Sequence, residues 1–300
     1  MPNAKLKNYF HLHFLVFIAG FTAILGELIT IGAIPLVWYR MLIASLLMAG
    51  FIAVTRTSFK ISSKDFRKFF LAGGIIALHW ITFFESINQA NVSIALSMFS
   101  AGAFFGAILE PIIYKRKIIW YEIFFGILVI IGVCIITQSE FKYLNGILLG
   151  IASAFFSSWF AVLNGTFLKS HSPTIISFYE FIGGVFCISL VLMFKEDGFS
   201  VEFFQLAKSD WLYIVVLASV CTAYAFIAVI HVMRYISPFS VILTYNLEPI
   251  YGITIALFLF PETEKMSNAF YIGAALIISV VILNGILKNK KDKTIKIDEN

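Results

Sequence analysis

Charged residues are scarce in this 300-residue chain, where they make up 13% of the sequence while hydrophobic residues make up 60%. A typical soluble domain is about 45–50% apolar and about 25% charged. The chain therefore has too few polar side chains to cover a water-facing globule. Its composition excludes an ordinary soluble protein and predicts an integral membrane protein.

Motifs for catalysis and metal binding are also lacking. The three cysteines, Cys134, Cys187 and Cys221, form no CxxC pair, and the five histidines form no HExxH motif. The sequence contains neither GxSxG nor the phosphate-binding pattern GxxxxGK(S/T). These absences argue against an enzyme and against an ATP-driven pump, and we expect no bound cofactor and no metal.

Long apolar runs dominate what is present. Because about 20 apolar residues cross a bilayer as a helix, we expect ten spans. They fall at about 9–30, 34–54, 68–88, 92–114, 118–138, 145–168, 173–194, 211–233, 238–260 and 267–287. The first run is long and no small-residue cleavage site follows it, so we expect it to remain as a span rather than to be removed as a signal peptide.

Lysine and arginine are concentrated in every second segment between these spans, which places them on one side of the membrane. The segments 56–68 and 288–296 carry five each, whereas the outer loops carry single lysines. Cytoplasmic loops of membrane proteins are enriched in Lys and Arg. We therefore predict a multi-pass protein of the cell membrane with both termini in the cytoplasm. The net charge of +5 then reflects topology, and no nucleic-acid partner is expected.

The two halves of the chain resemble each other. NQANVSIALSMFSAG (88–102) matches RYISPFSVILTYNLE (234–248) at an offset of 146, and YEIFFGILVIIGV (121–133) matches NAFYIGAALIISV (268–280) at an offset of 147. VWYRMLIASLL (37–47) and SFYEFIGGVFC (177–187) match at an offset of 140. Five helices is an odd number, so the second half enters the membrane from the opposite side, as in inverted-repeat transporters. We predict an all-α integral membrane protein of ten transmembrane helices in two inverted five-helix repeats, 1–140 and 141–288, with a charged cytoplasmic tail at 289–300.

Several stretches then point to a family. They are ALHWITFFESINQANVSIALSMFSAGAFFGAILEPIIYKRK, the turn R-Y-I-S-P at 234–238, the L-E-P at 247–249 and Arg40 early in the second span. With these features the chain resembles the EamA family of the drug/metabolite transporter superfamily. The first span departs from the family pattern, because GFTAILGELIT lacks the tryptophan–glycine pair often found there. The resemblance implies ten helices as two inverted repeats, and transport of amino acids, other metabolites or drugs, often outward, without a cofactor.

These observations favour a secondary transporter that works by alternating access between the repeats, with export of an amino acid or amino-acid-like compound as the first expectation. Import of a small metabolite and multidrug efflux are the alternatives within the superfamily. A membrane-embedded enzyme should show paired catalytic residues, and a scaffold or receptor should show a sizeable soluble segment; the sequence has neither. The expected partners are a small-molecule substrate, the lipid bilayer and protons as a coupling ion.

Glu248 is the most informative candidate residue. It lies about ten residues into a span, and a charge near the bilayer centre costs about 2.5 kcal/mol or more and usually marks a substrate or ion pathway. Either it pairs with a neighbouring helix while Pro249 kinks the span, or it lines a polar cavity and its protonation matters for transport. The second interpretation predicts that Tyr245 and Asn246 are near the same cavity.

The other candidate substrate-binding residues are Arg40, His79, Trp80, Ser97, Asn164, Glu180 and Tyr224. Arg40 presents a fork that fits a carboxylate, and it meets either a substrate or Glu27. His79 is either a structural histidine or a coupling site. Ser97 and Asn164 belong to polar stripes of their spans, Glu180 occupies the repeat position of Arg40, and Trp80, Tyr224 and Tyr245 suit a partly apolar, amino-acid-like molecule.

Overall fold

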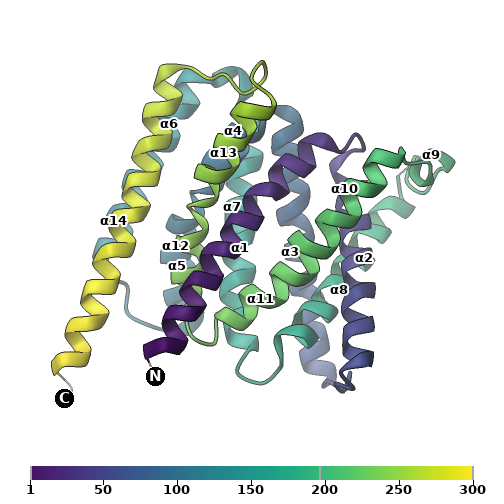
Figure 1. Ribbon diagram of the computed structural model, residues 1–300, viewed down its shortest axis with the longest axis horizontal. Coiled ribbons are helices and arrows are strands. Elements are labelled where there is room, and N and C mark those ends of the chain that lie inside the picture. Colours follow the sequence, from purple (N-terminus) through teal and green to yellow (C-terminus); the bar gives the residue numbers. More distant parts are fainter. Residues whose placement is uncertain (1, 196, 299–300) are drawn as a thin grey trace.

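The computed structural model describes residues 2–195 and 197–298, which form helices joined by short connections (Figure 1). The helices of the first half are α1 (Pro2–Leu28), α2 (Ala33–Val54), α3 (Ser63–Gln89), α4 (Val92–Phe99), α5 (Gly102–Tyr114) and α6 (Trp120–Ser139). Those of the second half are α7 (Leu144–Phe167), α8 (Pro173–Met193), α9 (Val201–Phe204), α10 (Lys208–Ala218), α11 (Ala225–Val232), α12 (Pro238–Tyr245), α13 (Glu248–Leu259) and α14 (Asn268–Asp298). A 3-10 turn, Phe141–Tyr143, precedes α7, and a π-helical segment, Ser219–Tyr224, joins α10 to α11. Both ends of the chain lie at the same end of the bundle (Figure 1).

Eight segments of the described residues are long and apolar enough to cross a bilayer. They correspond to the first four and the sixth to ninth of the expected spans. The other two expected spans are helices α6 and α14, whose apolar parts within the described residues, Ile123–Ser139 and Asn268–Val280, are shorter. The bundle is therefore that of a multi-pass membrane protein, with eight of the ten expected spans identified by length and composition.

Two of these spans are broken in the middle. Helix α4 ends at Phe99 and α5 begins at Gly102, and α12 ends at Tyr245 and α13 begins at Glu248. Each break contains a backbone hydrogen bond between residues three apart. These bonds run from Ala101 N to Met98 O (3.0 Å) and from Leu247 N to Thr244 O (3.0 Å). The residues that cap the ends of α4 and α12 are Ser100 and Asn246. They are 146 residues apart, which is the offset found between the two halves of the sequence.

The two broken spans run in opposite directions. Asn91, which caps the start of α4, donates to Thr263 O beyond the end of α13 at 3.0 Å, and the Glu264 carboxylate accepts from the backbone N–H groups of Val92 and Ser93. At the opposite end Glu110 of α5 accepts from Phe239 N at the start of α12. The start of each broken span therefore lies beside the end of the other.

Helix α3 of the first half packs closely against α8 of the second half. A Cβ on Gly73 would overlap the backbone carbonyl of Glu180, and a Cβ on Gly183 would meet the backbone of Phe70. The two helices can pack backbone to backbone only because these positions are glycine, as is common between membrane helices.

The outer surface of the bundle is apolar. Phe10, Phe14, Phe17 and Phe21 are exposed along one side of α1, at the spacing of one helix face. Such a surface fits lipid contact rather than water. The polar groups of the spans are turned inward instead.

Candidate functional site

A cavity of about 120 Å³ lies inside the bundle, where the two helix breaks meet. Its lining comes from both halves of the chain: Ala19, Thr22, Arg40, His79, Trp80, Phe83, Phe99, Gly102, Ser157, Ser158, Phe160, Ala161, Cys221, Ala225, Phe226, Val229, Met233, Val241, Ile242, Tyr245, Asn246 and Glu248. Each break therefore contributes residues to its wall. A space of this size holds several water molecules or a small metabolite.

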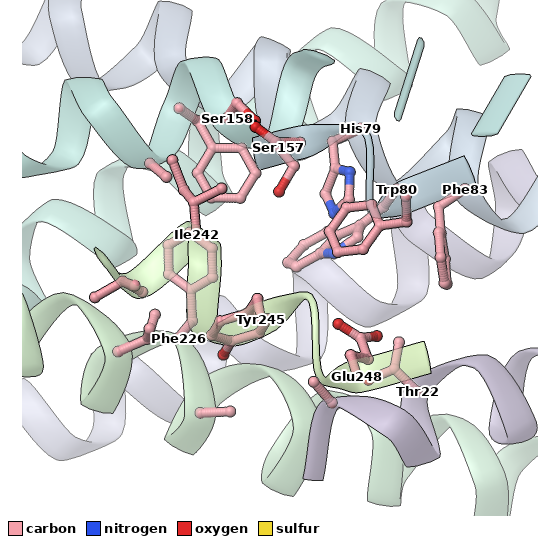
Figure 2. Close-up of a pocket in the computed structure, with 18 of the residues that line it drawn as sticks. Thr22, His79, Trp80, Phe83, Ser157, Ser158, Phe226, Ile242, Tyr245 and Glu248 are labelled. Carbon is pink, nitrogen blue, oxygen red and sulfur yellow. The ribbon is translucent and has the colours of Figure 1, made fainter. Parts of the chain in front are cut away.

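Glu248 is the first residue of α13, and Pro249 follows it at the second position. The break precedes this pair, so the proline starts a helix, where its missing N–H costs nothing, instead of kinking one. A carboxylate at a helix N-terminus is stabilised by the helix dipole. Figure 2 shows the Glu248 carboxyl group pointing into the cavity, between Tyr245 and Thr22. Among the described residues its side chain has no hydrogen-bond partner.

Arg40 lies on the cavity wall, fixed by neighbours on two sides. Its Nε donates to Thr222 Oγ1 at 2.6 Å and its Nη2 approaches Cys221 O at 3.4 Å. Its guanidinium carbon lies 3.9 Å from the centre of the Trp80 ring, a cation–π contact. The buried Nη1 has no hydrogen-bond partner in the part of the chain that the structure describes. This donor remains available to an anionic ligand.

Arg40 and Glu248 line the same cavity, but the described residues contain no direct ion pair between them. The alternative pairing of Arg40 with Glu27 is not formed in the described residues either, since Glu27 is exposed on α1. The cavity thus carries a guanidinium group and a carboxyl group that are not joined by direct contact.

The π-helical segment Ser219–Tyr224 supplies the partners of Arg40. Within it Thr222 Oγ1 donates to Leu217 O, five residues back, at 2.7 Å. A π-bulge inserts a residue into a helix and often occurs at a functional site. The extra residue turns Cys221 and Thr222 toward Arg40, a role for these residues that the sequence analysis did not predict.

His79 lies on the wall opposite Glu248 (Figure 2). Its Nδ1 is 3.1 Å from Ser153 O and 2.9 Å from Ser153 Oγ, and Ser153 Oγ lies 3.1 Å from His79 O. A proton on Nδ1 is compatible with both contacts, because a carbonyl oxygen only accepts and a hydroxyl oxygen can accept. Ser153 therefore fixes the ring, so His79 has a structural contact as well as a place on the cavity wall.

Aromatic rings make up most of the remaining wall. The ring centres of Trp80 and Phe226 are 6.0 Å apart and those of Phe160 and Phe226 are 5.7 Å apart. Phe83 and Phe99 close the side next to His79. An apolar wall with a few convergent polar groups is the usual form of a small-molecule site.

The structure brings six of the ten candidate residues to this cavity: Arg40, His79, Trp80, Tyr245, Asn246 and Glu248. The others lie elsewhere. Ser97 is buried in α4 with an unpartnered hydroxyl. Tyr224 is exposed, and its hydroxyl bonds to His11 Nε2 at 2.9 Å. Asn164 and Glu180 are buried next to each other, away from the cavity lining.

Several wall residues were not predicted as site residues, including Thr22, Ser157, Ser158, Phe160 and Phe226. Ser157 belongs to the same polar stripe as Ser153 and Asn164, and that stripe was the available signal. The phenylalanines gave no signal, because the chain contains 33 of them and most face lipid or other helices.

Comparison with known proteins decides the family. The model of the EamA-like transporter family matches residues 8–138 and again residues 144–286. The chain belongs to the EamA-like transporter family. A solved structure described only as "Crystal structure of protein" is similar in fold, with a TM-score of 0.67 at 14% sequence identity over 96% of this chain and 99% of that chain. No curated protein matches the chain.

The first family match ends at residue 138 and the second begins at residue 144. Membership makes the protein a membrane transporter of the drug/metabolite superfamily, with a small-molecule substrate and the lipid bilayer as partners. The cavity between the helix breaks is the feature of this EamA-like protein that fits such a task.

Proposed function

We propose that this EamA-like protein is a secondary transporter that exports an amino acid or an amino-acid-like metabolite across the cell inner membrane. One observation carries the substrate class: Arg40 and Glu248 face one cavity without a direct ion pair. A zwitterion complements this pair, since its carboxylate fits the free Nη1 donor of Arg40 and its ammonium group fits the Glu248 carboxylate.

The rest of the cavity suits the side chain of such a substrate. Trp80, Phe83, Phe99, Phe160 and Phe226 give it an apolar wall, which favours a hydrophobic or aromatic amino acid over a charged one.

Alternating access is supported by the arrangement of the two halves. Each contributes one broken span, the two run in opposite directions, and the breaks meet at the cavity. Broken helices at the interface of inverted repeats are the usual substrate site of secondary transporters. In this proposal the chain has ten spans in two inverted five-helix repeats, and both termini are cytoplasmic.

The test is metabolite profiling of cells with and without the protein, followed by transport assays of the identified compound in vesicles. We expect overproduction to deplete one hydrophobic amino acid, or a close analogue, from the cells and to raise tolerance to its toxic analogues. Increased accumulation of that compound would show import instead. A transported compound without either a carboxylate or an amine would contradict the role given to Arg40 and Glu248.

A further inference from the structure

Glu180 of α8 is a second buried carboxyl group, separate from the cavity. Its relative exposure is 0%, and neither carboxyl oxygen has a hydrogen-bond partner among the described residues. It is not among the residues that line the cavity. An ionised carboxylate without a counter-charge or hydrogen bonds is strongly unfavourable in such a place, so this environment favours the protonated form.

Asn164 of α7 is the polar neighbour of this carboxyl group. Its exposure is 1%, and both its Oδ1 and its Nδ2 are unpartnered. A carboxylic acid donates one hydrogen bond and accepts others, while an amide offers both an acceptor and donors. A small side-chain rotation would let the protonated Glu180 donate to Asn164 Oδ1. The ionised form could only accept from Nδ2.

No charged group of the described residues acts on the Glu180 carboxyl group. The titratable or charged residues on the elements packed around it are Tyr39 and Arg40 of α2, Lys64, Asp65, Arg67, Lys68, His79 and Glu85 of α3, His231 of α11, and Tyr179 and Cys187 of α8 itself; α7 has none. Arg40 is held by Thr222 and Cys221, and His79 by Ser153. Neither neutralises Glu180.

A metal ion does not suit the position. The described residues contain no group of three side chains that could hold one, and the polar atoms of Glu180 and Asn164 are closed off from solvent. A proton needs no coordination shell and no cavity. It is the ligand that fits a dry carboxyl group with one amide neighbour.

Glu180 lies at a contact between the two halves, so a movement of one half relative to the other would change its surroundings. Gly73 of α3 packs directly on the backbone of Glu180, so separation of α3 from α8 would admit water to the carboxyl group. The next residue, Phe181, contacts the cavity residue Trp80 with ring centres 5.4 Å apart. The packing around Glu180 is thus continuous with the wall of the cavity.

We infer that Glu180 and Asn164 form a proton-binding site at the α3–α8 crossing, occupied in this conformation and emptied when the two helices separate. The site is distinct from the substrate cavity at Glu248. Its use in driving transport rests on the transporter function proposed above, whereas proton binding itself does not.

Infrared spectroscopy of the purified full-length protein in lipid tests the inference without any substrate. At neutral pH the parent should show the C=O stretching band of a protonated carboxylic acid. Glu180→Gln should lose one component of this band, and both Glu248→Gln and the control Glu85→Gln, on α3 near its end, should keep that component. Identical spectra for the parent and Glu180→Gln would overturn the inference, and would leave the proposed transport function standing.

A second variant covers the case in which Glu180→Gln does not fold. Asn164→Leu removes the amide neighbour, so the band should remain but move in frequency. An unchanged band in this variant would overturn the assignment of Asn164 as the partner.

Amide hydrogen exchange tests whether the proton is released when the helices separate. After correction for the intrinsic pH dependence of amide exchange, alkaline pH should speed exchange around Gly73 and Gly184 in the parent and not in Glu180→Gln. The same pH response in both proteins would contradict release of the proton on helix separation.

Discussion

Arg40 and Glu248, from opposite halves of the chain, line one cavity, and the residues that the structure describes form no direct ion pair between them. Arg40 instead binds Thr222 and Cys221 and stacks on Trp80. Glu248 begins a half-helix. The two side chains are thus held by separate surroundings, which leaves both able to bind a ligand.

Replacement of Arg40 by lysine should weaken substrate binding while the charge is kept. Lysine cannot reproduce the planar fork that holds Thr222 and offers a free Nη1. A hydrogen bond to a charged group contributes about 1.5–3 kcal/mol, so we expect the KM for the substrate to rise about 10-fold to 100-fold. Transport kinetics in vesicles measure this. Arg234→Lys, at an exposed arginine, is the control, and an equal KM in both variants would contradict a substrate contact at Arg40.

Alanine in place of Gly73 and alanine in place of Gly50 should have different effects on the free energy of unfolding. A methyl group at Gly73 would overlap the Glu180 backbone, whereas a methyl group at Gly50 of α2 meets no atom within 4 Å. Gly73→Ala should lower the free energy of unfolding by about 1–3 kcal/mol. Gly50→Ala should leave it unchanged or raise it by up to about 1 kcal/mol, because alanine favours helix. Thermal unfolding in detergent compares the two, and equal stability of both would refute the close α3–α8 crossing.

Replacement of Glu264 should lower the stability of the protein. Its two carboxylate oxygens accept from Val92 N and Ser93 N, each at 2.9 Å, and so cap α4. Glu264→Ala should cost about 1–2 kcal/mol of stability. The neighbouring exposed Glu262 supplies the control Glu262→Ala, for which little change is expected. A smaller effect at Glu264 than at Glu262 would show that the cap contributes nothing.

Topology can be tested with two single cysteines in a cysteine-free background. Ser62 precedes α3 and Asp197 follows α8, and both positions are exposed. With both termini cytoplasmic, Ser62→Cys should react with an impermeant thiol reagent only in opened cells, and Asp197→Cys should react in intact cells. Labelling of both positions from outside would exclude the proposed orientation and the ten-span arrangement.

Much of this architecture could be predicted from the sequence, because bilayer thickness sets the length of a span and the two repeats share a pattern. The offset of 146 places Ser100 opposite Asn246, and the structure breaks a span at each. That Glu248 and Arg40 face a cavity could be predicted, because a charge inside a span needs a polar environment.

Which face of each helix is turned toward the interior of the bundle could not be predicted from the sequence. In a soluble protein the polar face of a helix shows which side is buried, but lipid is as apolar as the protein core. Tyr224 therefore gave no sign that it faces outward toward His11. Glu180 and Asn164 likewise gave no sign that they meet away from the cavity. The π-helical segment at Ser219–Tyr224 also has no compositional signature, and it decides which residues hold Arg40.

Transport by Glu248→Gln tests the central claim most directly. The variant keeps the size of the side chain at the start of α13 and removes only its charge, so it should fold and reach the membrane. In vesicles loaded with the profiled substrate, we expect its transport rate to fall at least about tenfold, corresponding to about 1.4 kcal/mol, or its pH dependence to disappear, while Glu85→Gln behaves as the parent. A rate and a pH profile equal to those of the parent would contradict the account and reduce Glu248 to a structural residue.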